Sequence, residues 1–177
     1  MKTKLICISA CLGLVAGSAW AQEKRQLTMS GEGAKGKYVQ QHIIDMDDVP
    51  GHQLRIYEVH RDYPSDNGPE IEGEKIVEAW VRGFSNYTNG VGPVYGNTTF
   101  ITDKGNKIFV EGIGTSESQT TESGSKRGTY HGTSRFVGGT GKFTKIRGTF
   151  VDISKFDTDP KNGYNTVDTH GEYWFEK

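Results

Sequence analysis

Apolar and polar positions alternate in short segments along most of the chain, which is the two-residue period of β-strands. These segments are mostly rich in β-branched and aromatic residues. No long stretch places apolar residues at helical spacing, so the pattern predicts an essentially all-β chain. Eight strands are expected, at residues 38–46, 53–63, 75–88, 93–102, 107–116, 127–137, 146–156 and 164–176.

Turn-forming residues separate these segments, for example Asn89-Gly90 and the run 159–163 with its Pro, Asn and Gly. Eight antiparallel strands joined in sequence can close into a barrel, which removes exposed sheet edges. The interior of such a barrel is wide enough for packed side chains or one small ligand. We therefore favour an eight-stranded antiparallel β-barrel of calycin type, with a two-sheet sandwich as the alternative.

The first 21 residues predict a cleaved secretory signal peptide. Lys2 and Lys4 precede an apolar run, and the segment ends in Ala19-Trp20-Ala21. Lipid attachment at Cys11 is the alternative. Residues 22–36 have few apolar positions and no period, so we expect a flexible lead-in, followed by one barrel domain over 37–177. The expected location is the periplasm or outside the cell, without insertion into a membrane.

Charge and cysteine content exclude several kinds of chemistry. The whole chain has 21 basic and 22 acidic residues, a balance that argues against a nucleic-acid partner. Both cysteines, Cys7 and Cys11, lie in the expected leader, so no disulfide or thiolate nucleophile is expected afterwards. His131 and His170 lie on different predicted strands without metal-ligand spacing. We therefore expect neither a metal nor another cofactor.

Four glycines occur within FVGGTGKFTKIRG, residues 136–148. A phosphate-binding loop would open a helix, but the residues after this cluster alternate like a strand. Glycine also lets a strand turn sharply or approach a neighbour closely. The cluster is therefore expected to be a hairpin connection, with Phe136 and Phe143 as apolar anchors on either side.

The same cluster resembles the glycine signature shared by allene oxide cyclases and dirigent proteins, both eight-stranded barrels. Residues 54–60 (LRIYEVH) and 100–112 (FITDKGNKIFVEG) resemble an early strand and the central hairpin of the cyclases. The resemblance implies a barrel with a hydrophobic small molecule inside, and a homotrimer. The family's asparagine is replaced here by His60, and the chain after the leader lacks the family's cysteine.

Glu58 and His60 are the candidate catalytic residues. The strand period places them on one face with Leu54 and Ile56, which predicts a cavity that is apolar at one end and polar at the other. Burial would raise the pKa of Glu58. The resemblance implies that Glu58 promotes opening of a fatty-acid epoxide and that His60 helps to hold a water molecule. In the alternative, Tyr57 and Val59 face inward and Glu58 faces outward, because both faces of this strand are mixed.

Six further residues are candidates for contacting a substrate. Trp80 and Phe84 share a face with Glu78 and Arg82, although the opposite face with Val77, Ala79 and Val81 is equally suited to the core. Arg147 occupies the arginine position of the dirigent-type ending, where the resemblance implies an orienting role and a surface position is the alternative. The complete candidate set is Tyr57, Trp80, Phe84, Phe109, Arg147 and Tyr173.

The function expected from these features is that of an exported, cofactor-free cyclase or isomerase that acts on an unsaturated hydrophobic molecule. Confinement of one reactive conformer would supply most of the rate enhancement. The alternative is a non-catalytic carrier of hydrophobic ligands, or a dirigent-like guide of a coupling reaction that is initiated elsewhere. The feature that distinguishes the enzyme from the carrier is whether Glu58 points inward beside the apolar lining.

Overall fold

The computed structural model describes residues 22–31, 34–64, 66, 68–122, 124–157 and 164–177, so the expected signal peptide lies outside the described residues. The described chain is a β-sheet with a single 3-10 turn, η1 (Gly141–Phe143), and none of its helical segments is long and apolar enough to cross a membrane. The strands are β1 (Arg25–Gly31), β2 (Lys35–Asp45), β3 (His52–Asp62), β4 (Glu70–Ile71), β5 (Glu74–Thr88), β6 (Val91–Thr102), β7 (Lys107–Thr120), β8 (Lys126–Gly139), β9 (Ile146–Asp157) and β10 (Tyr164–Phe175).

The all-β, antiparallel prediction is confirmed, and each of the eight expected segments forms a strand close to its predicted limits. The prediction of a flexible lead-in is wrong for Arg25–Gly31, which forms β1 and pairs with β10. Leu27 and Met29 alternate with exposed residues and are buried in the core. This alternation is only three apolar or small positions long, too short to stand out from a polar segment.

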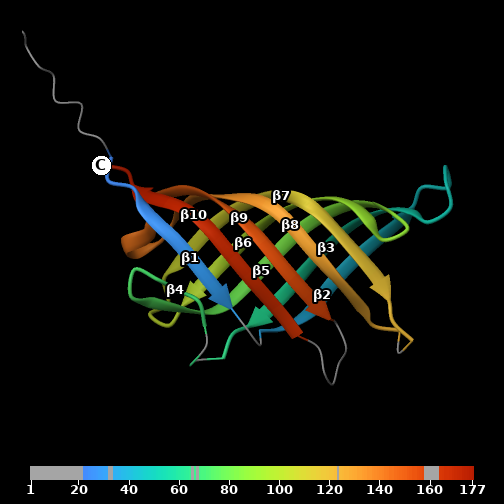
Figure 1. The fold of residues 1–177 in the computed structure, drawn as a ribbon, viewed down its shortest axis with the longest axis horizontal. Helices are drawn as coiled ribbons and strands as arrows, with labels where there is room; N and C mark the ends of the chain where they lie inside the picture. The colour runs from blue at the N-terminus through green and yellow to red at the C-terminus, as the bar shows by residue number, and fades with distance from the viewer. Residues whose placement is uncertain (1–21, 32–33, 65, 67, 123, 158–163) are drawn as a thin grey trace, which may run out of the picture.

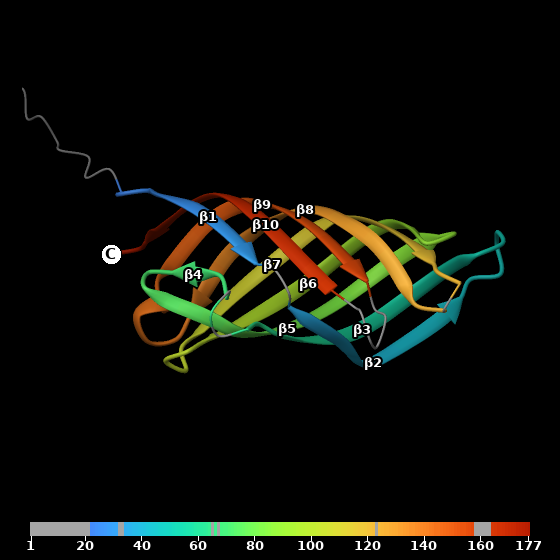
Figure 2. The same cartoon turned by 60° about the horizontal axis from the view of Figure 1, so that its bottom comes forward.

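The strands form one sheet in the order β1-β10-β9-β8-β7-β6-β5-β3-β2, with β4 paired to β5. The sheet curls around a long axis, so that β1 and β2 come round toward each other (Figure 1, Figure 2). β2 approaches β10, but the described residues contain no backbone ladder that joins β2 to β1 or β10. The expected closed barrel of eight strands is therefore replaced by a curled sheet of ten strands.

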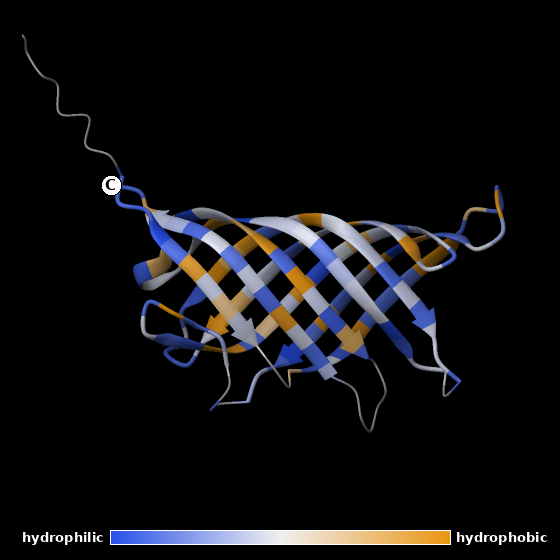
Figure 3. Ribbon diagram, in the orientation of Figure 1, coloured by the Kyte–Doolittle hydropathy of each residue, from blue (hydrophilic) through white to orange (hydrophobic). Residues whose placement is uncertain are grey.

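One end of the curled sheet is filled by a hydrophobic core. The core lies at the starts of β5, β7 and β9 and at the ends of β3 and β8, which meet at one end because neighbouring strands are antiparallel. Apolar and polar residues alternate along the strands that lead away from it (Figure 3). Phe136 and Phe150 pack with ring centroids 4.7 Å apart, and Tyr173 contacts Phe136 edge-on at 6.4 Å. The core closes this end, and the remaining interior lies toward the turns β2–β3 and β5–β6.

The glycine cluster forms the connection between β8 and β9, as predicted. Gly141 has a φ of 56°, a left-handed conformation that favours glycine, and it begins the short turn η1. Strand β9 follows this turn, so the backbone amides of a helix N-terminus are not available here for a phosphate group. Phe136 and Phe143 are both buried in the core, as expected of apolar anchors.

Glu74 is a buried carboxylate at the core end of the sheet. It accepts hydrogen bonds from Thr102 Oγ1 at 2.6 Å and from Asn106 Nδ2 at 3.0 Å, and it pairs with Lys142 Nζ at 3.1 Å. Burial raises the pKa of Glu74, but the hydrogen bonds from Thr102, Asn106 and Lys142 outweigh this effect and lower the pKa from 4.5 to about 2. The carboxylate therefore joins the β4–β5 turn to the β6–β7 turn and to η1.

Glu74→Gln is expected to lower the free energy of unfolding near neutral pH by about 1.5–3 kcal/mol, because charge-assisted hydrogen bonds are lost. The folded-state pKa of Glu74 lies below its unfolded value, so its contribution is fully present above about 4.5 and is lost as the pH falls toward about 2. Urea unfolding at a series of pH values should therefore show a difference between wild type and variant that shrinks on acidification. Glu70→Gln, at an exposed position on β4, is the control. A difference that is constant with pH would contradict this role.

Candidate functional site

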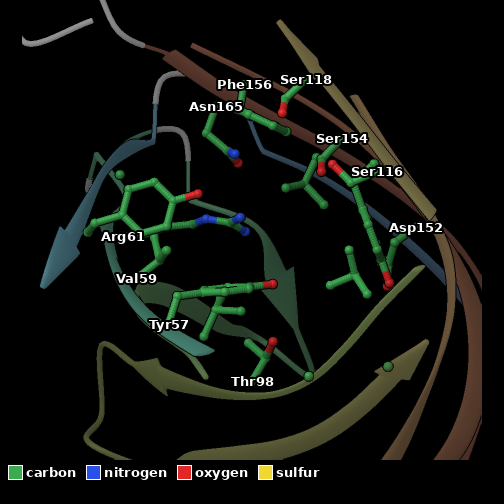
Figure 4. Close-up of a pocket in the computed structure, with 18 of the residues that line it drawn as sticks. Tyr57, Val59, Arg61, Thr98, Ser116, Ser118, Asp152, Ser154, Phe156 and Asn165 are labelled. Atoms are coloured by element: carbon green, nitrogen blue, oxygen red, sulfur yellow. The ribbon is translucent and has the colours of Figure 1, made fainter. Parts of the chain in front are cut away.

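A cavity of about 180 Å³ lies inside the curled sheet, beyond the core. Its walls come from most of the strands, because inward-facing residues alternate with outward-facing residues along each strand. Figure 4 shows side chains from opposite walls that point into the same space. The apolar part of the lining consists of Val59, Val81, Val94, Phe100, Val110, Phe150, Phe156 and Val167.

Strand β3 contributes Arg55, Tyr57, Val59 and Arg61 to this lining. Opposite Tyr57 in the β3–β5 register is Gly83. A Cβ atom at Gly83 would lie only 2.5 Å from Tyr57 Cζ, so the absence of a side chain there makes room for the tyrosine ring. This close approach explains how a large ring fits on the inner face of β3.

Asp152 on β9 is a partly buried carboxyl group in the cavity wall. It accepts hydrogen bonds from Ser134 Oγ at 2.6 Å and from Thr169 Oγ1 at 2.8 Å. Burial raises the pKa of Asp152, and the two hydrogen bonds and the positive charge of Arg61 reduce but do not cancel this effect. The group is therefore better suited to exchange a proton near neutral pH than an exposed aspartate is.

Two tyrosines add hydroxyl groups to the same space. Burial raises the pKa of Tyr130 to about 12, and Asp152 adds to the increase. Burial also raises the pKa of Tyr57 well above its ordinary value of 10.0. Both hydroxyls therefore keep their protons at neutral pH and can donate hydrogen bonds to a ligand oxygen.

The arrangement combines apolar walls with a few fixed polar groups, as is typical of small-molecule sites. Figure 4 shows Tyr57 and Arg61 extending from one wall and Asp152 facing them from another. A flat apolar ligand can pack between the walls while an oxygen atom pairs with a tyrosine hydroxyl or with Asp152. The geometry of the cavity therefore suits the binding and orientation of a small molecule.

The predicted inward orientation of Glu58 and His60 is wrong, since the alternative phase is observed. Neither residue lines the cavity, and Glu58 Oε2 pairs instead with Arg82 Nε at 2.6 Å, directly opposite in the β3–β5 register. His60 Nε2 lies 3.2 Å from Glu78 Oε2. The two faces of β3 have similar composition, so composition does not decide which face points inward. The neighbouring strand β5 does: Arg82 pairs with Glu58 on the outer face, and Gly83 leaves room for the ring of Tyr57 on the inner face.

Of the six predicted substrate-contacting residues, Tyr57 lines the cavity, whereas the other five do not. Trp80 packs outside against the His60 ring at 4.3 Å, and Phe84 packs near Tyr95 at 6.4 Å. Phe109 lies between Ile108 and Val110, whose side chains are buried inside, and so has the outward phase.

The remaining two candidates belong to other parts of the molecule. Arg147 Nη2 pairs with Glu176 Oε2 at 2.8 Å, near the end of β10. Tyr173 belongs to the core that closes one end of the sheet, and its hydroxyl donates to Glu72 Oε1 at 2.5 Å. Whether any of the predicted residues contacts a substrate stays a prediction.

Sequence reasoning did not identify Asp152, Tyr130 or Arg55 as site residues. A signal for Asp152 was available, because it shares the phase of Phe150 and Ser154 on a strand that the glycine cluster introduces. A carboxylate in phase with core residues points toward the interior. Arg55 likewise shares the phase of Tyr57 and Val59, which was considered as the inward alternative.

Metal binding has no support within the part of the chain that the structure describes. No group of three or more His, Cys, Asp or Glu side chains converges there in a way that could hold a metal ion. His170 contacts the nearby Asp168, with Nε2 and Oδ1 3.2 Å apart, on the exposed face of β10.

In comparisons with known proteins, no protein-family model matches the chain, and no curated protein matches its sequence. The solved structures that are similar to it include two dirigent proteins. The pterocarpan synthase dirigent protein PsPTS1 has a TM-score of 0.44 and 16% identity, over 88% of this chain and 97% of that chain. The pterocarpan synthase dirigent protein GePTS1 has a TM-score of 0.43 and 15% identity, over 99% of this chain and 100% of that chain. Similarity at this level does not assign a ligand or a reaction.

Proposed function

We propose that the chain binds a small, mostly apolar, unsaturated molecule inside the curled sheet and holds it in one conformation, as a guide for a reaction that is initiated elsewhere. The observation that supports this proposal best is a cavity whose walls are largely apolar and include the polar groups of Tyr57, Tyr130 and Asp152. Its volume of about 180 Å³ is close to that of a cavity able to hold a benzene ring, ~150 Å³. A ligand with one aromatic ring and a short unsaturated chain is therefore the best match in size.

A guide of this kind needs positioning more than covalent chemistry. Holding reacting groups in a near-attack geometry can supply about 7–11 kcal/mol of the barrier reduction. The tyrosine hydroxyls would fix the orientation of the ligand by hydrogen bonds, and the valine and phenylalanine side chains would restrict its shape. Because the chain would only shape the reaction, the oxidant or activating partner would come from outside it.

The second candidate function is the cofactor-free isomerase or cyclase, with Asp152 in place of Glu58 as the acid. The specific observation in its favour is the raised pKa of Asp152, because a carboxyl group with a raised pKa is better suited to acid catalysis than an ordinary one. Asp152 would give its proton to a developing oxyanion of the ligand and regain one in the next step. Asp152 on β9 would then have the role that the sequence predicts for Glu58 on β3.

Asp152→Asn separates the two functions. Asparagine Oδ1 can still accept the hydrogen bond from Thr169, and the hydroxyl of Ser134 can rotate to accept one from the amide Nδ2, so the variant should fold, but it cannot transfer a proton. Wild type and variant are incubated with extracts of apolar metabolites, and the bound molecules are identified by mass spectrometry. We expect both proteins to retain the same ligand in unchanged form.

Other outcomes decide against this expectation in different ways. Conversion by wild type, with a loss of about 100-fold or more in the variant, would favour the isomerase over the guide. Recovery of no ligand from either protein would contradict both functions.

An export signal and a homotrimer stay predictions for this protein. The outer face carries a row of register-matched apolar side chains, in which Ile56, Phe84, Tyr95 and Ile113 lie on neighbouring strands and are exposed. An exposed apolar row of this kind is compatible with contact between subunits.

A further inference from the structure

Arg55 is a cationic side chain inside the cavity, near the end of the curled sheet that lies opposite the core. Its guanidinium carbon lies 4.9 Å from the ring centroid of Tyr57, and 5.4 Å from the ring centroids of both Tyr38 and Tyr87. The three rings stabilise the cation through their electron-rich faces. They supply no carboxylate, and none of the ion pairs among the described residues involves Arg55.

Polar atoms beside Arg55 also lack partners. Arg55 Nε is buried without a hydrogen bond, and so is the hydroxyl of Ser85, which lies directly opposite Arg55 in the β3–β5 register. Across the cavity, Asn165 Oδ1 is buried without a partner as well. These are the only such side-chain atoms within the described residues. Arg55 and Asn165 both line the cavity, and unsatisfied buried polar groups are destabilising, so these residues indicate that the cavity has a place for a polar ligand group.

The charge of the lining is also unusual for this chain. The cavity is lined by four basic residues, Lys37, Arg55, Arg61 and Lys126, and by two acidic residues, Asp152 and Asp157. Asp157 already pairs with Arg127, with Oδ2 and Nε 2.9 Å apart. The whole chain has a formal net charge of −1. A positively charged interior in a slightly acidic protein favours an anionic ligand.

We propose that the ligand is a small unsaturated or aromatic carboxylate whose anionic group pairs with Arg55 while its apolar part fills the cavity. This inference rests on the proposed function and adds the charge of the ligand to it. The three tyrosines provide no carboxylate partner for the guanidinium group, so its Nη–H groups can bind the carboxylate of a ligand in a bidentate manner.

The test uses trans-cinnamate and its neutral amide, cinnamamide, which have nearly the same shape and differ in charge. Binding of each probe is measured by isothermal titration calorimetry. We expect wild type to bind cinnamate about tenfold or more tightly than cinnamamide, as a charge-assisted contact requires. Arg55→Met should remove this preference and leave the affinity for cinnamamide within about twofold of wild type.

Arg82→Met is the matched control, because Arg82 lies on the outer face of β5 and pairs with Glu58. This variant should keep the full preference for cinnamate. Should Arg55→Met fail to fold, as judged by circular dichroism, Arg55→Lys keeps the charge and loses the planar fork. The lysine variant should then retain a reduced preference for the carboxylate.

The outcomes distinguish this inference from the proposed function. Equal binding of the two probes by wild type, or an unchanged preference for cinnamate in Arg55→Met, would overturn the role of Arg55 and leave the cavity as a binding site. A preference that is lost equally in Arg55→Lys and in Arg82→Met would also overturn it. Absence of binding of both probes to wild type would contradict the proposed function itself.

Discussion

Replacing Thr98 with phenylalanine is expected to weaken binding of the ligand about 10- to 150-fold. Thr98 lines the cavity from β6, between Val81 and Val110 in the register of the neighbouring strands. A phenyl ring at this position would occupy much of the space, and a ligand would have to expel it. Burial of a phenylalanine side chain is worth about 1.5–3 kcal/mol, which corresponds to this loss of affinity. Titration of trans-cinnamate into the variant measures the effect.

The matched control is the adjacent residue of the same type. Thr99 lies opposite Trp80 and Phe109, on the outer face of the sheet. Thr99→Phe should therefore bind cinnamate as wild type does, although both variants add the same ring to the same strand. Equal losses of affinity in the two variants would place the binding site outside the cavity or indicate a general loss of structure.

The largest expected effect on stability is that of Phe136→Ala, about 3–5 kcal/mol lower free energy of unfolding. Phe136 is only 2% exposed and packs against Phe150 and Tyr173 in the core that closes one end of the curled sheet. Removal of the ring leaves a cavity among the ends of several strands, and the glycine-rich connection that follows cannot move in to fill it. Urea denaturation monitored by circular dichroism measures the loss.

Val137→Ala is the control for this substitution. Val137 is the next residue on β8 but is 37% exposed, so its truncation should cost no more than about 0.5–1 kcal/mol. A loss for Phe136→Ala as small as that of Val137→Ala would show that the core tolerates an empty volume at this end. The cavity would then not be bounded by a rigid core.

The sequence predicted the strands well because their signals are local. Asn89 and Gly90 show how: both have positive φ values, 52° and 83°, as a tight hairpin turn between β5 and β6 requires. Asn and Gly adopt positive φ values more readily than other residues, so Asn-Gly between two alternating segments predicts a tight turn. The glycine cluster at 136–148 was interpreted correctly for a similar reason, because a strand rather than a helix follows it.

The orientation of the site strand was not accessible in the same way. On β3 the residues Leu54, Ile56, Glu58 and His60 alternate with Arg55, Tyr57, Val59 and Arg61, and each set mixes apolar with charged side chains. A period of two residues does not choose between two such faces. The choice depends on residues that are distant in sequence, Gly83 beneath Tyr57 and Arg82 beside Glu58, and these neighbours appear only in the assembled sheet.

The alternation of apolar and polar residues also did not predict whether the sheet closes into a barrel. β1 pairs with β10, whereas β2 pairs with β3, so the described sheet has no backbone pairing between β1 and β2. The pattern of residues does not show which partner each of these two strands takes. Composition predicted an irregular segment there, because polar residues outnumber Leu27 and Met29. Burial of these two side chains against the core outweighs the weak local preference.

A crystal structure of the protein with trans-cinnamate tests the central claim, ligand binding inside the curled sheet, most directly. We predict electron density for the aromatic ring within the cavity, in contact with Tyr57 and Thr98. Density for the ring on the outer face, near Glu58 and His60, would contradict the account.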